Sequence, residues 1–189
     1  MSTQTLERII STPGNQEKFE VNKNHLRVYG HTLCPFVARA RYALALKKIP
    51  FQDVQMDLNQ KAQWHLDFNG GMVPVLETPA GDLIKESGVV AMFAHEEGKD
   101  HGVDLFPKDP IEAAKLRVEI ENASKYLTPF FATMMSRGED QEKNKKVAEM
   151  IEGFSALLSK ANGKFLFGTD EPTMLDVYYA PFLEILYLW

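Results

Sequence analysis

Cys34 is the only cysteine in the chain, and its surroundings favour a reactive thiol. Residues 26–29 alternate as in a strand, residues 30–33 suit a turn, and helical spacing then extends to about residue 48. Pro35 fits the first position of that helix, where a backbone N–H would have no partner in any case. We therefore expect Cys34 at the helix N-terminus, where free N–H groups and the helix dipole stabilise a thiolate, the nucleophilic form of cysteine.

A second cysteine is missing from the position where a dithiol oxidoreductase would carry one. Val37 stands there, so the Cys-x-x-Cys motif is not completed. A mixed disulfide on Cys34 would then have to be resolved by a small thiol from solution. A lone cysteine can also be a small core residue, and this alternative stays open. His31 is a candidate base for Cys34, but the helix end already supplies activation, and a turn histidine commonly faces solvent.

Two later motifs suit the binding of a small ligand. The apolar run at residues 72–77 predicts a strand that begins near Pro74, because proline cannot donate a ladder hydrogen bond. A cis Val73–Pro74 bond would expose the backbone of Val73 to a ligand, whereas a trans proline at a strand start is the ordinary alternative. Glu86 and Ser87 precede a helical pattern, with Ser87 as the expected N-cap. Together they could hold the amine and carboxylate of an α-amino acid, although a plain helix cap is the alternative.

The order of the predicted elements indicates an α/β domain followed by an all-α domain. Strands at 26–29 and 51–56 flank the Cys34 helix as a βαβ unit, which favours parallel pairing. The strand at 72–77 and a return strand at 83–84 form a hairpin before the next helix, completing a ββα unit in a mixed sheet. We expect an N-terminal extension (1–25), the α/β domain (26–98), a linker rich in Gly and Pro (99–110) and the all-α domain (111–189).

The all-α domain is predicted from three helical patterns. Residues 111–136 have apolar side chains at helical spacing, with a kink expected at Pro129. A second pattern covers residues 147–161. Thr173 and Asp176 have the spacing of a capping box for a last helix that is apolar on nearly every side. Such a helix must be buried, and we expect its partners to lie outside this sequence.

Composition limits the classes of function. The net charge of −5 and pI near 5.6 argue against a nucleic-acid-binding protein, since no basic stripe would neutralise phosphates. The sequence contains no run of about 18 apolar residues, so it predicts no membrane-spanning helix, and the N-terminus lacks the pattern of a secretory signal. The histidines have no metal-ligand spacing, so we predict no metal. A single cysteine allows no disulfide framework, which favours the cytoplasm.

From about Leu26 to Trp189 the chain resembles the cytosolic glutathione transferases, and especially the omega class with its dehydroascorbate reductases and its chloride-intracellular-channel-like neighbours. The resemblance rests on four motifs in the same order: Cys34-Pro35-Phe36, residues 72–77, Glu86-Ser87, and the box from Thr173 to Asp176. It implies a thioredoxin-like N-terminal domain followed by an all-α domain, which here is shortened at its C-terminus relative to the family.

The resemblance also implies roles for individual residues. Cys34 would be the catalytic nucleophile that forms a mixed disulfide with glutathione, the cosubstrate. The residues implied to bind glutathione are Phe36 at the thiol, Lys61 at the glycine carboxylate, Val73 and the cis Pro74 at the cysteinyl backbone, and Glu86 with Ser87 at the γ-glutamyl amine and carboxylate. Hydroxyl-dependent classes would instead use a tyrosine or serine near this turn. The position of Cys34 at the helix start favours the cysteine-dependent class over Tyr29 or Thr32.

The function implied is glutathione-dependent thiol transfer and dehydroascorbate reduction, with weak conjugation of glutathione to electrophiles, by a cytoplasmic homodimer. The second substrate would be a small oxidised or electrophilic molecule. One alternative is a membrane-interacting or binding protein like the chloride-intracellular-channel family, although Arg39 and Arg41 interrupt any apolar run after Cys34. The other alternative is a catalytically idle relative that still binds glutathione.

Overall fold

The computed structural model describes residues 5–10, 18–136 and 141–188. The chain divides into two compact units, Met1–Gly102 and Val103–Trp189. The first unit contains the sheet and the helices that follow its strands, while the second is helical.

The first unit is built on one five-stranded sheet in the order β1-β3-β2-β4-β5. Its parallel strands are β1 (Thr5–Ile10), β3 (Phe51–Gln55) and β2 (Leu26–Gly30). β4 (Val75–Glu77) pairs antiparallel with both β2 and β5 (Leu83–Lys85). The sheet is therefore mixed, with a βαβ unit followed by a ββα unit, and the predicted thioredoxin-like fold is confirmed.

Strand β1 is an addition to the expected fold. From the sequence, residues 1–25 are expected to form an extension without a strand, and residues 1–4 and 11–17 of it lie outside the described part. Thr5–Ile10 nevertheless pairs parallel with β3 as an edge strand, with an irregularity between Thr5 and Glu7. Polar and apolar residues do not alternate regularly in this segment, so the sequence gives no clear strand signal. The pairing of an edge strand depends on its partner as much as on its own sequence.

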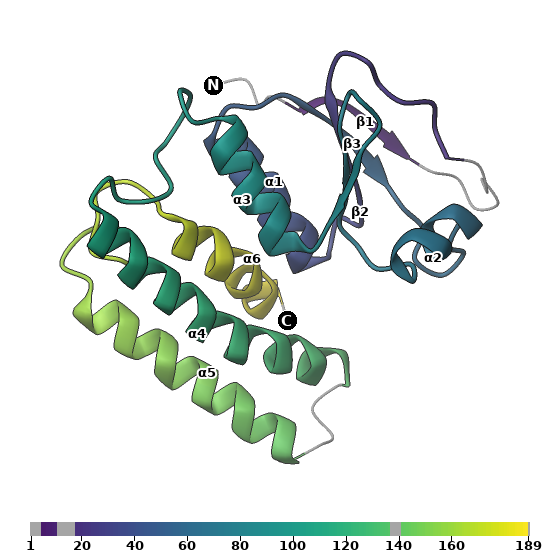
Figure 1. Ribbon diagram of the computed structural model, residues 1–189. Coiled ribbons are helices and arrows are strands. Elements are labelled where there is room, and N and C mark those ends of the chain that lie inside the picture. The colour runs from purple at the N-terminus through teal and green to yellow at the C-terminus, as the bar shows by residue number, and fades with distance from the viewer. Residues whose placement is uncertain (1–4, 11–17, 137–140, 189) are drawn as a thin grey trace. The chain divides into compact units, whose positions relative to one another are not determined.

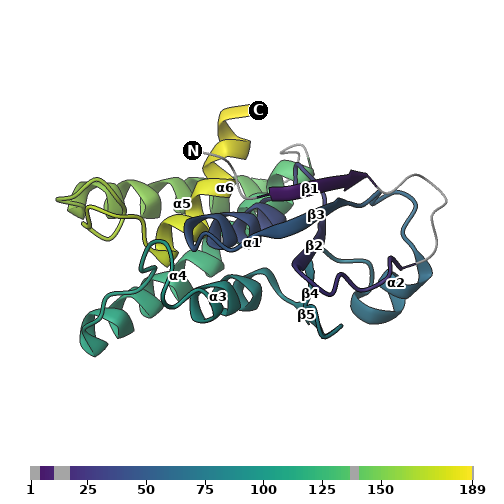
Figure 2. The same cartoon turned by 90° about the horizontal axis from the view of Figure 1, so that it is seen from above.

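Helices cover both faces of the sheet (Figures 1 and 2). α1 (Pro35–Leu46) and α3 (Ser87–Glu97) pack side by side on one face, where buried alanines let the helices approach closely. α2 (Gln63–Asn69) lies on the other face. There Trp64 and Phe68 pack against a buried cluster that includes Tyr29 and Val75. The loops at the strand ends are thereby held on a core that is packed from both sides.

The second unit contains α4 (Pro110–Met135), α5 (Gln141–Lys160) and α6 (Met174–Leu188). Asp109 caps α4 by accepting hydrogen bonds from two backbone N–H groups, each at 2.9 Å, and Pro129 lies inside that helix as predicted. α4 packs against α5 and α6, and the Phe130 and Phe182 rings meet edge to face. The pattern of three helices predicted from the sequence is confirmed.

The start of α6 uses half of the predicted capping box. The Asp176 carboxylate accepts hydrogen bonds from the N–H and the hydroxyl of Thr173, at 2.7 and 2.9 Å. The Thr173 hydroxyl thus donates to Asp176 instead of accepting from a backbone N–H. The same carboxylate also accepts from the N–H of Leu166, at 3.0 Å. The box therefore ties the preceding turn to the helix.

Within this chain only the first half of α6 is buried, whereas its apolar pattern on nearly every side predicts a helix that partners outside the sequence would have to cover. Met174 to Tyr179 are mostly buried, as is Phe182. Leu186 is 39% exposed and Tyr187 91% exposed, so the final turn is not covered. An apolar pattern predicts burial only where neighbouring elements reach the helix.

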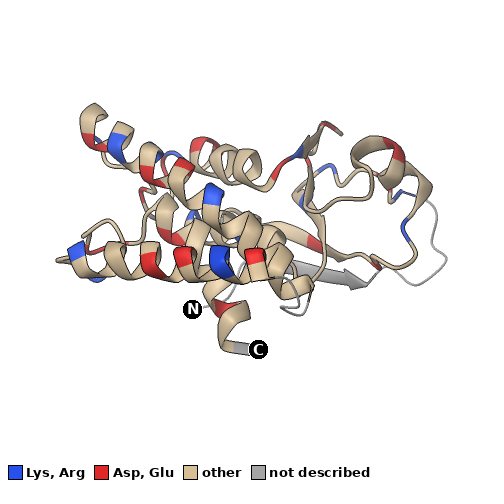
Figure 3. Cartoon of the chain, turned by 90° about the horizontal axis from the view of Figure 1, so that it is seen from below, with Lys and Arg blue, Asp and Glu red and all other residues tan. Residues whose placement is uncertain are grey.

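None of the described helices combines the length and the apolar character that a membrane-spanning segment requires. In the view of Figure 3, acidic and basic residues are interspersed along the helices. This mixed distribution accompanies the net charge of −5 and forms no basic stripe in that view.

Candidate active site around Cys34

Cys34 is the N-cap residue of α1, as the position of Pro35 predicts. Its backbone is extended (φ −88°, ψ 117°), and its carbonyl accepts a hydrogen bond from the N–H of Ala38 at 3.0 Å. Its own N–H donates to the carbonyl of His31, at 3.2 Å, which closes the preceding turn. The side chain is partly exposed and makes no capping hydrogen bond. The sulfur is therefore reachable at the end of a fixed backbone.

The Cys34 thiol is less acidic than its position at a helix N-terminus leads one to expect. Burial raises the pKa of the Cys34 thiol above its ordinary value, although backbone N–H groups of α1 and the guanidinium charges of Arg41 and Arg39 act in the opposite direction. The helix end, on which the expectation rested, does favour the thiolate. Desolvation of the sulfur outweighs it, so the net effect of the fold is to disfavour the thiolate.

Arg41 on α1 fastens the turn that precedes Cys34. Its Nε and Nη2 donate to one Asp53 oxygen at 3.0 and 2.8 Å, and its Nη1 donates to the carbonyl of His31 at 3.4 Å. Gln55 donates to the other Asp53 oxygen at 2.8 Å and accepts from the hydroxyl of Thr32 at 2.6 Å. Sequence reasoning missed this network. The available signal was an aspartate in a central, otherwise buried strand, which requires a charged partner.

The His31 ring takes part in the turn that precedes Cys34. Its Nδ1 accepts a hydrogen bond from the N–H of Leu33 at 3.2 Å, which uses the lone pair of that nitrogen. This nitrogen is therefore engaged within the turn.

The Val73–Pro74 bond is cis, in agreement with the first of the two alternatives considered from the sequence. The residue before it is held from α2: His65 Nε2 lies 2.7 Å from the carbonyl of Met72, and Asn69 donates to the same carbonyl at 3.1 Å. Since a carbonyl accepts, His65 donates from Nε2. Burial lowers the pKa of His65, which keeps its ring neutral and this tautomer available.

Lys61 lies beside the same loop. A side chain added at Gly71 would collide with the Lys61 side chain, which therefore crosses the backbone two residues before Val73. Its charge also lowers the pKa of His65, after the larger effect of burial. Lys61 therefore lies against the loop that leads to the cis proline.

The helix that follows β5 begins one residue earlier than expected, so Glu86 and Ser87 stand one position further into it. The N-cap is Glu86, with the rare backbone combination φ 68° and ψ 114°, and Ser87 is the first residue of α3. The prediction of Ser87 as N-cap is therefore wrong, because the chain turns at Glu86, and composition cannot reveal that dihedral. Glu86 is exposed, whereas Ser87 is buried and accepts a hydrogen bond from Arg39 Nη1 at 2.9 Å. A positive φ at a residue other than glycine often marks a functional site.

Strand register brings these motifs to one end of the sheet. Val75 on β4 pairs with Tyr29 on β2 and with Lys85 on β5. The Cys34 turn follows β2, the cis proline precedes β4, and Glu86 follows β5, so all three leave the sheet at that end. We call the group formed by Cys34, Val73, Glu86 and Ser87 the Cys34 site. Phe36 adds a half-buried ring at the start of α1, with the Arg39 guanidinium 5.7 Å from its centroid.

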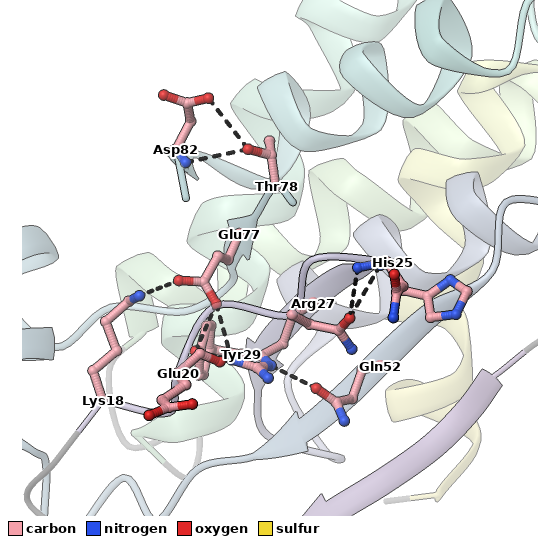
Figure 4. Close-up of polar contacts among 11 residues, drawn as sticks. Lys18, Glu20, His25, Arg27, Tyr29, Gln52, Glu77, Thr78 and Asp82 are labelled. Carbon is pink, nitrogen blue, oxygen red and sulfur yellow. Dashed lines mark hydrogen bonds and ion pairs between the residues drawn. The ribbon is translucent and has the colours of Figure 1, made fainter. Parts of the chain in front are cut away.

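A second polar group lies further along the same strands, and we call it the Arg27–Glu77 cluster (Figure 4). Arg27 donates to Glu77 at 3.0 Å, to the hydroxyl of Tyr29 at 3.1 Å and to Gln52 at 2.6 Å, and Lys18 forms an ion pair with Glu77. The Tyr29 hydroxyl also donates to Glu77, at 3.1 Å. Burial raises the pKa of Tyr29 to about 12. This tyrosine is fully buried and is not available to activate a ligand at the Cys34 site.

Among the residues that the structure describes, no group of three or more His, Cys, Asp and Glu side chains could hold a metal ion. The chemistry available at the site is that of one thiol, one exposed carboxylate, one buried hydroxyl and the loop before a cis proline. These groups suit a small thiol that also carries an amino-acid headgroup.

Comparisons with known proteins agree with this description. Residues 33–97 match the family model described as "Glutathione S-transferase, N-terminal domain". Glutathione S-transferase omega-1 of Mus musculus is 30% identical over 169 residues, which cover 88% of this chain and 69% of that protein. The Sus scrofa protein of the same name is 32% identical over 165 residues, covering 85% and 67% respectively. The crystal structure of glutathione transferase Omega 3C from Trametes versicolor superposes with a TM-score of 0.75 at 27% identity, covering 87% of this chain and 74% of that one.

Proposed function

The chain belongs to the omega class of the glutathione S-transferase family, and we propose that it is a glutathione-dependent thioltransferase and dehydroascorbate reductase whose nucleophile is Cys34. The observation that carries this proposal is one accessible thiol at the N-terminus of α1, in a chain with no second cysteine. A conjugating enzyme needs only to activate bound glutathione. A cysteine in that position supports covalent exchange with glutathione instead.

The proposed exchange is balanced by glutathione alone. The Cys34 thiolate attacks the glutathionyl sulfur of a mixed disulfide, forming a Cys34–glutathione disulfide and releasing the substrate as a thiol after it takes up a proton. A glutathione thiolate then attacks the glutathionyl sulfur held by Cys34, which yields glutathione disulfide and restores the Cys34 thiolate. With dehydroascorbate, two glutathione molecules are oxidised to one disulfide while the substrate gains two electrons and two protons to become ascorbate.

We assign the binding of glutathione to residues 26–98. Glu86 would bind the γ-glutamyl amine and Ser87 its carboxylate, the Val73 backbone would pair with the cysteinyl unit, and Phe36 would line the thiol site. Lys61 would bind the glycine carboxylate. These assignments are supported by the strand register that gathers the motifs at one end of the sheet and by the Lys61 side chain across Gly71. We further propose a cytoplasmic homodimer with weak conjugating activity, without a metal.

The test is the intact mass of the wild type and of Cys34→Ser after incubation with glutathione disulfide. We expect one glutathionyl adduct on the wild type, reversed by glutathione, and none on the variant. Dehydroascorbate reduction and reduction of a mixed disulfide of glutathione should both fall at least about 100-fold in Cys34→Ser, since the nucleophile is removed. Full reductase activity in the variant would overturn the mechanism. Retention of the wild type on immobilised glutathione without any adduct would favour the catalytically idle relative.

A further inference from the structure

Arg39 is a buried cation at the contact between α1 and α3. Its residue is 5% exposed, and Nη1 donates to the Ser87 hydroxyl at 2.9 Å across the two helices. The Phe36 ring lies 5.7 Å from its guanidinium carbon, on the side toward the start of α1. Burying a guanidinium is costly unless it is hydrogen-bonded, so the position of Arg39 is set by polar contacts and not by packing alone.

The hydrogen bond from Arg39 determines what Ser87 can do. A hydroxyl has one donor hydrogen and two acceptor lone pairs, and Arg39 can only donate. Ser87 therefore uses a lone pair toward Arg39, and its own O–H remains oriented as a donor to another group. A hydroxyl that already accepts from a cation is also a stronger donor, because polarisation adds along a chain of hydrogen bonds.

Resting on the proposed function, we propose that Arg39 is a positioning residue for the γ-glutamyl carboxylate of glutathione: it orients the Ser87 hydroxyl as a donor and places a buried positive charge behind it. The charge acts on this end of the molecule, since Arg39 also lowers the pKa of Cys34, although less than burial raises it. A carboxylate held by Ser87 would then gain both a charge-polarised hydrogen bond and a nearby counter-charge.

The competing explanation is that Arg39 only fastens α1 to α3. The two roles differ in which part of the ligand they affect. A fastening residue supports the whole site, so its loss would weaken every ligand alike. A positioning residue for the carboxylate would matter only for ligands that carry this carboxylate. The discriminating probe is 4-aminobutanoyl-cysteinylglycine, which is glutathione without the γ-glutamyl α-carboxylate.

The test measures dissociation constants of glutathione and of this analogue under reducing conditions, for the wild type, Arg39→Met, Arg39→Lys and Ser87→Ala. We expect Arg39→Met to weaken glutathione about 10-fold and the analogue less than about 2-fold, as for loss of a charge-assisted hydrogen bond. Arg39→Lys keeps the charge without the planar fork and should weaken glutathione by only about 3-fold. In the Ser87→Ala background, Arg39→Met should have a smaller effect, because the two residues act as one unit.

Equal weakening of both ligands in Arg39→Met, or no change in the preference for glutathione, would overturn the inference. If Arg39→Met fails to fold by circular dichroism, the same comparison on Arg39→Lys decides, and an unchanged preference there overturns it. A wild type that binds glutathione no better than the analogue, or binds neither, would instead contradict the proposed function of the site. The two failures are therefore distinguishable in one set of titrations.

Discussion

The Arg27–Glu77 cluster and the Cys34 site both depend on strands β2 and β4, yet they use their polar groups differently. Arg27 and Glu77 lie on these strands, whereas the residues of the Cys34 site lie in segments that follow β2, precede β4 and follow β5. In the cluster the buried Glu77 carboxylate is satisfied from within the protein by Arg27, Lys18 and Tyr29 (Figure 4). At the Cys34 site the Glu86 carboxylate is exposed. Glu77 is the last residue of β4, whereas Glu86 directly follows β5.

This difference separates stability from function within one sheet. A buried ion pair whose partners also share hydrogen bonds fixes the register of the strands that carry it, and removing one partner leaves an uncompensated charge. An exposed carboxylate at a strained helix start contributes little to folding but remains available to a ligand. We therefore expect substitutions in the Arg27–Glu77 cluster to affect stability and substitutions at the Cys34 site to affect binding.

The strongest test of this separation is Glu77→Ala. The substitution leaves the Arg27 guanidinium, in a residue 5% exposed, without its carboxylate and should lower the free energy of unfolding by about 3–5 kcal/mol. Urea denaturation should be followed by the fluorescence of Trp64, whose ring lies 5.1 Å from that of Tyr29, in a Trp189→Phe background. In that background Trp64 is the sole tryptophan.

The matched control is Glu86→Ala, which removes a carboxylate from the exposed end of the same hairpin. It should change the free energy of unfolding by no more than about 0.5 kcal/mol, as is usual for surface positions. A loss below about 1 kcal/mol in Glu77→Ala would show that the cluster is not a determinant of stability, and the contrast between the two regions would disappear.

The elements that position the site could be predicted from the sequence because they depend on local rules. A strand, a turn and Pro35 define the start of α1, and Cys34 is its N-cap residue as expected. The apolar hairpin and the three helical patterns after the linker follow from periodicity in the same way. The sequence alone therefore predicts that the candidate residues lie at the ends of strands.

Features that depend on tertiary neighbours could not be predicted. The pairing of Arg39 with Ser87 joins residues 48 positions apart, and sequence alone gives no reason to prefer it over other acceptors. Strand β1 depends on β3 for its pairing. The net rise in the pKa of Cys34 comes from burial, which is a property of the folded chain and not of the Cys-Pro motif.

The acidity of Cys34 shows how strongly its sulfur is desolvated, although the site is open to a ligand. Burial raises the pKa of this thiol, and the thiolate is the form that reacts, so the rate of alkylation by iodoacetamide should rise with pH. At pH values well below the pKa of a thiol, the rate rises about tenfold per pH unit, and in the protein we expect this rise to continue to a higher pH than for a solvated thiol. The measurement is the mass of the protein after timed alkylation.

N-Acetylcysteine under the same conditions is the reference for an exposed thiol. Its rate should begin to level off at a lower pH than that of Cys34, because its thiol is fully solvated. If the protein instead reaches a plateau below about pH 8, the helix end and the two arginines outweigh burial. The Cys34 site would then be electrostatically activated before any ligand binds.

The smallest expected effect concerns the backbone of Glu86, which holds φ 68° in a residue that is not glycine. Glycine adopts this conformation without strain but has more freedom to lose on folding, so Glu86→Gly should raise the free energy of unfolding by about 1 kcal/mol. Glu86→Ala keeps the strain and should not be stabilised, while both variants lose the carboxylate and should bind glutathione more weakly to a similar extent. Urea denaturation and glutathione titration of the two variants provide the measurement.

Equal stability of the glycine and alanine variants would mean that the dihedral costs nothing, whereas unchanged glutathione affinity in both would remove Glu86 from the Cys34 site. A stability gain accompanied by a binding loss would show that, at this one residue, the chain gives up stability to present a group to its ligand.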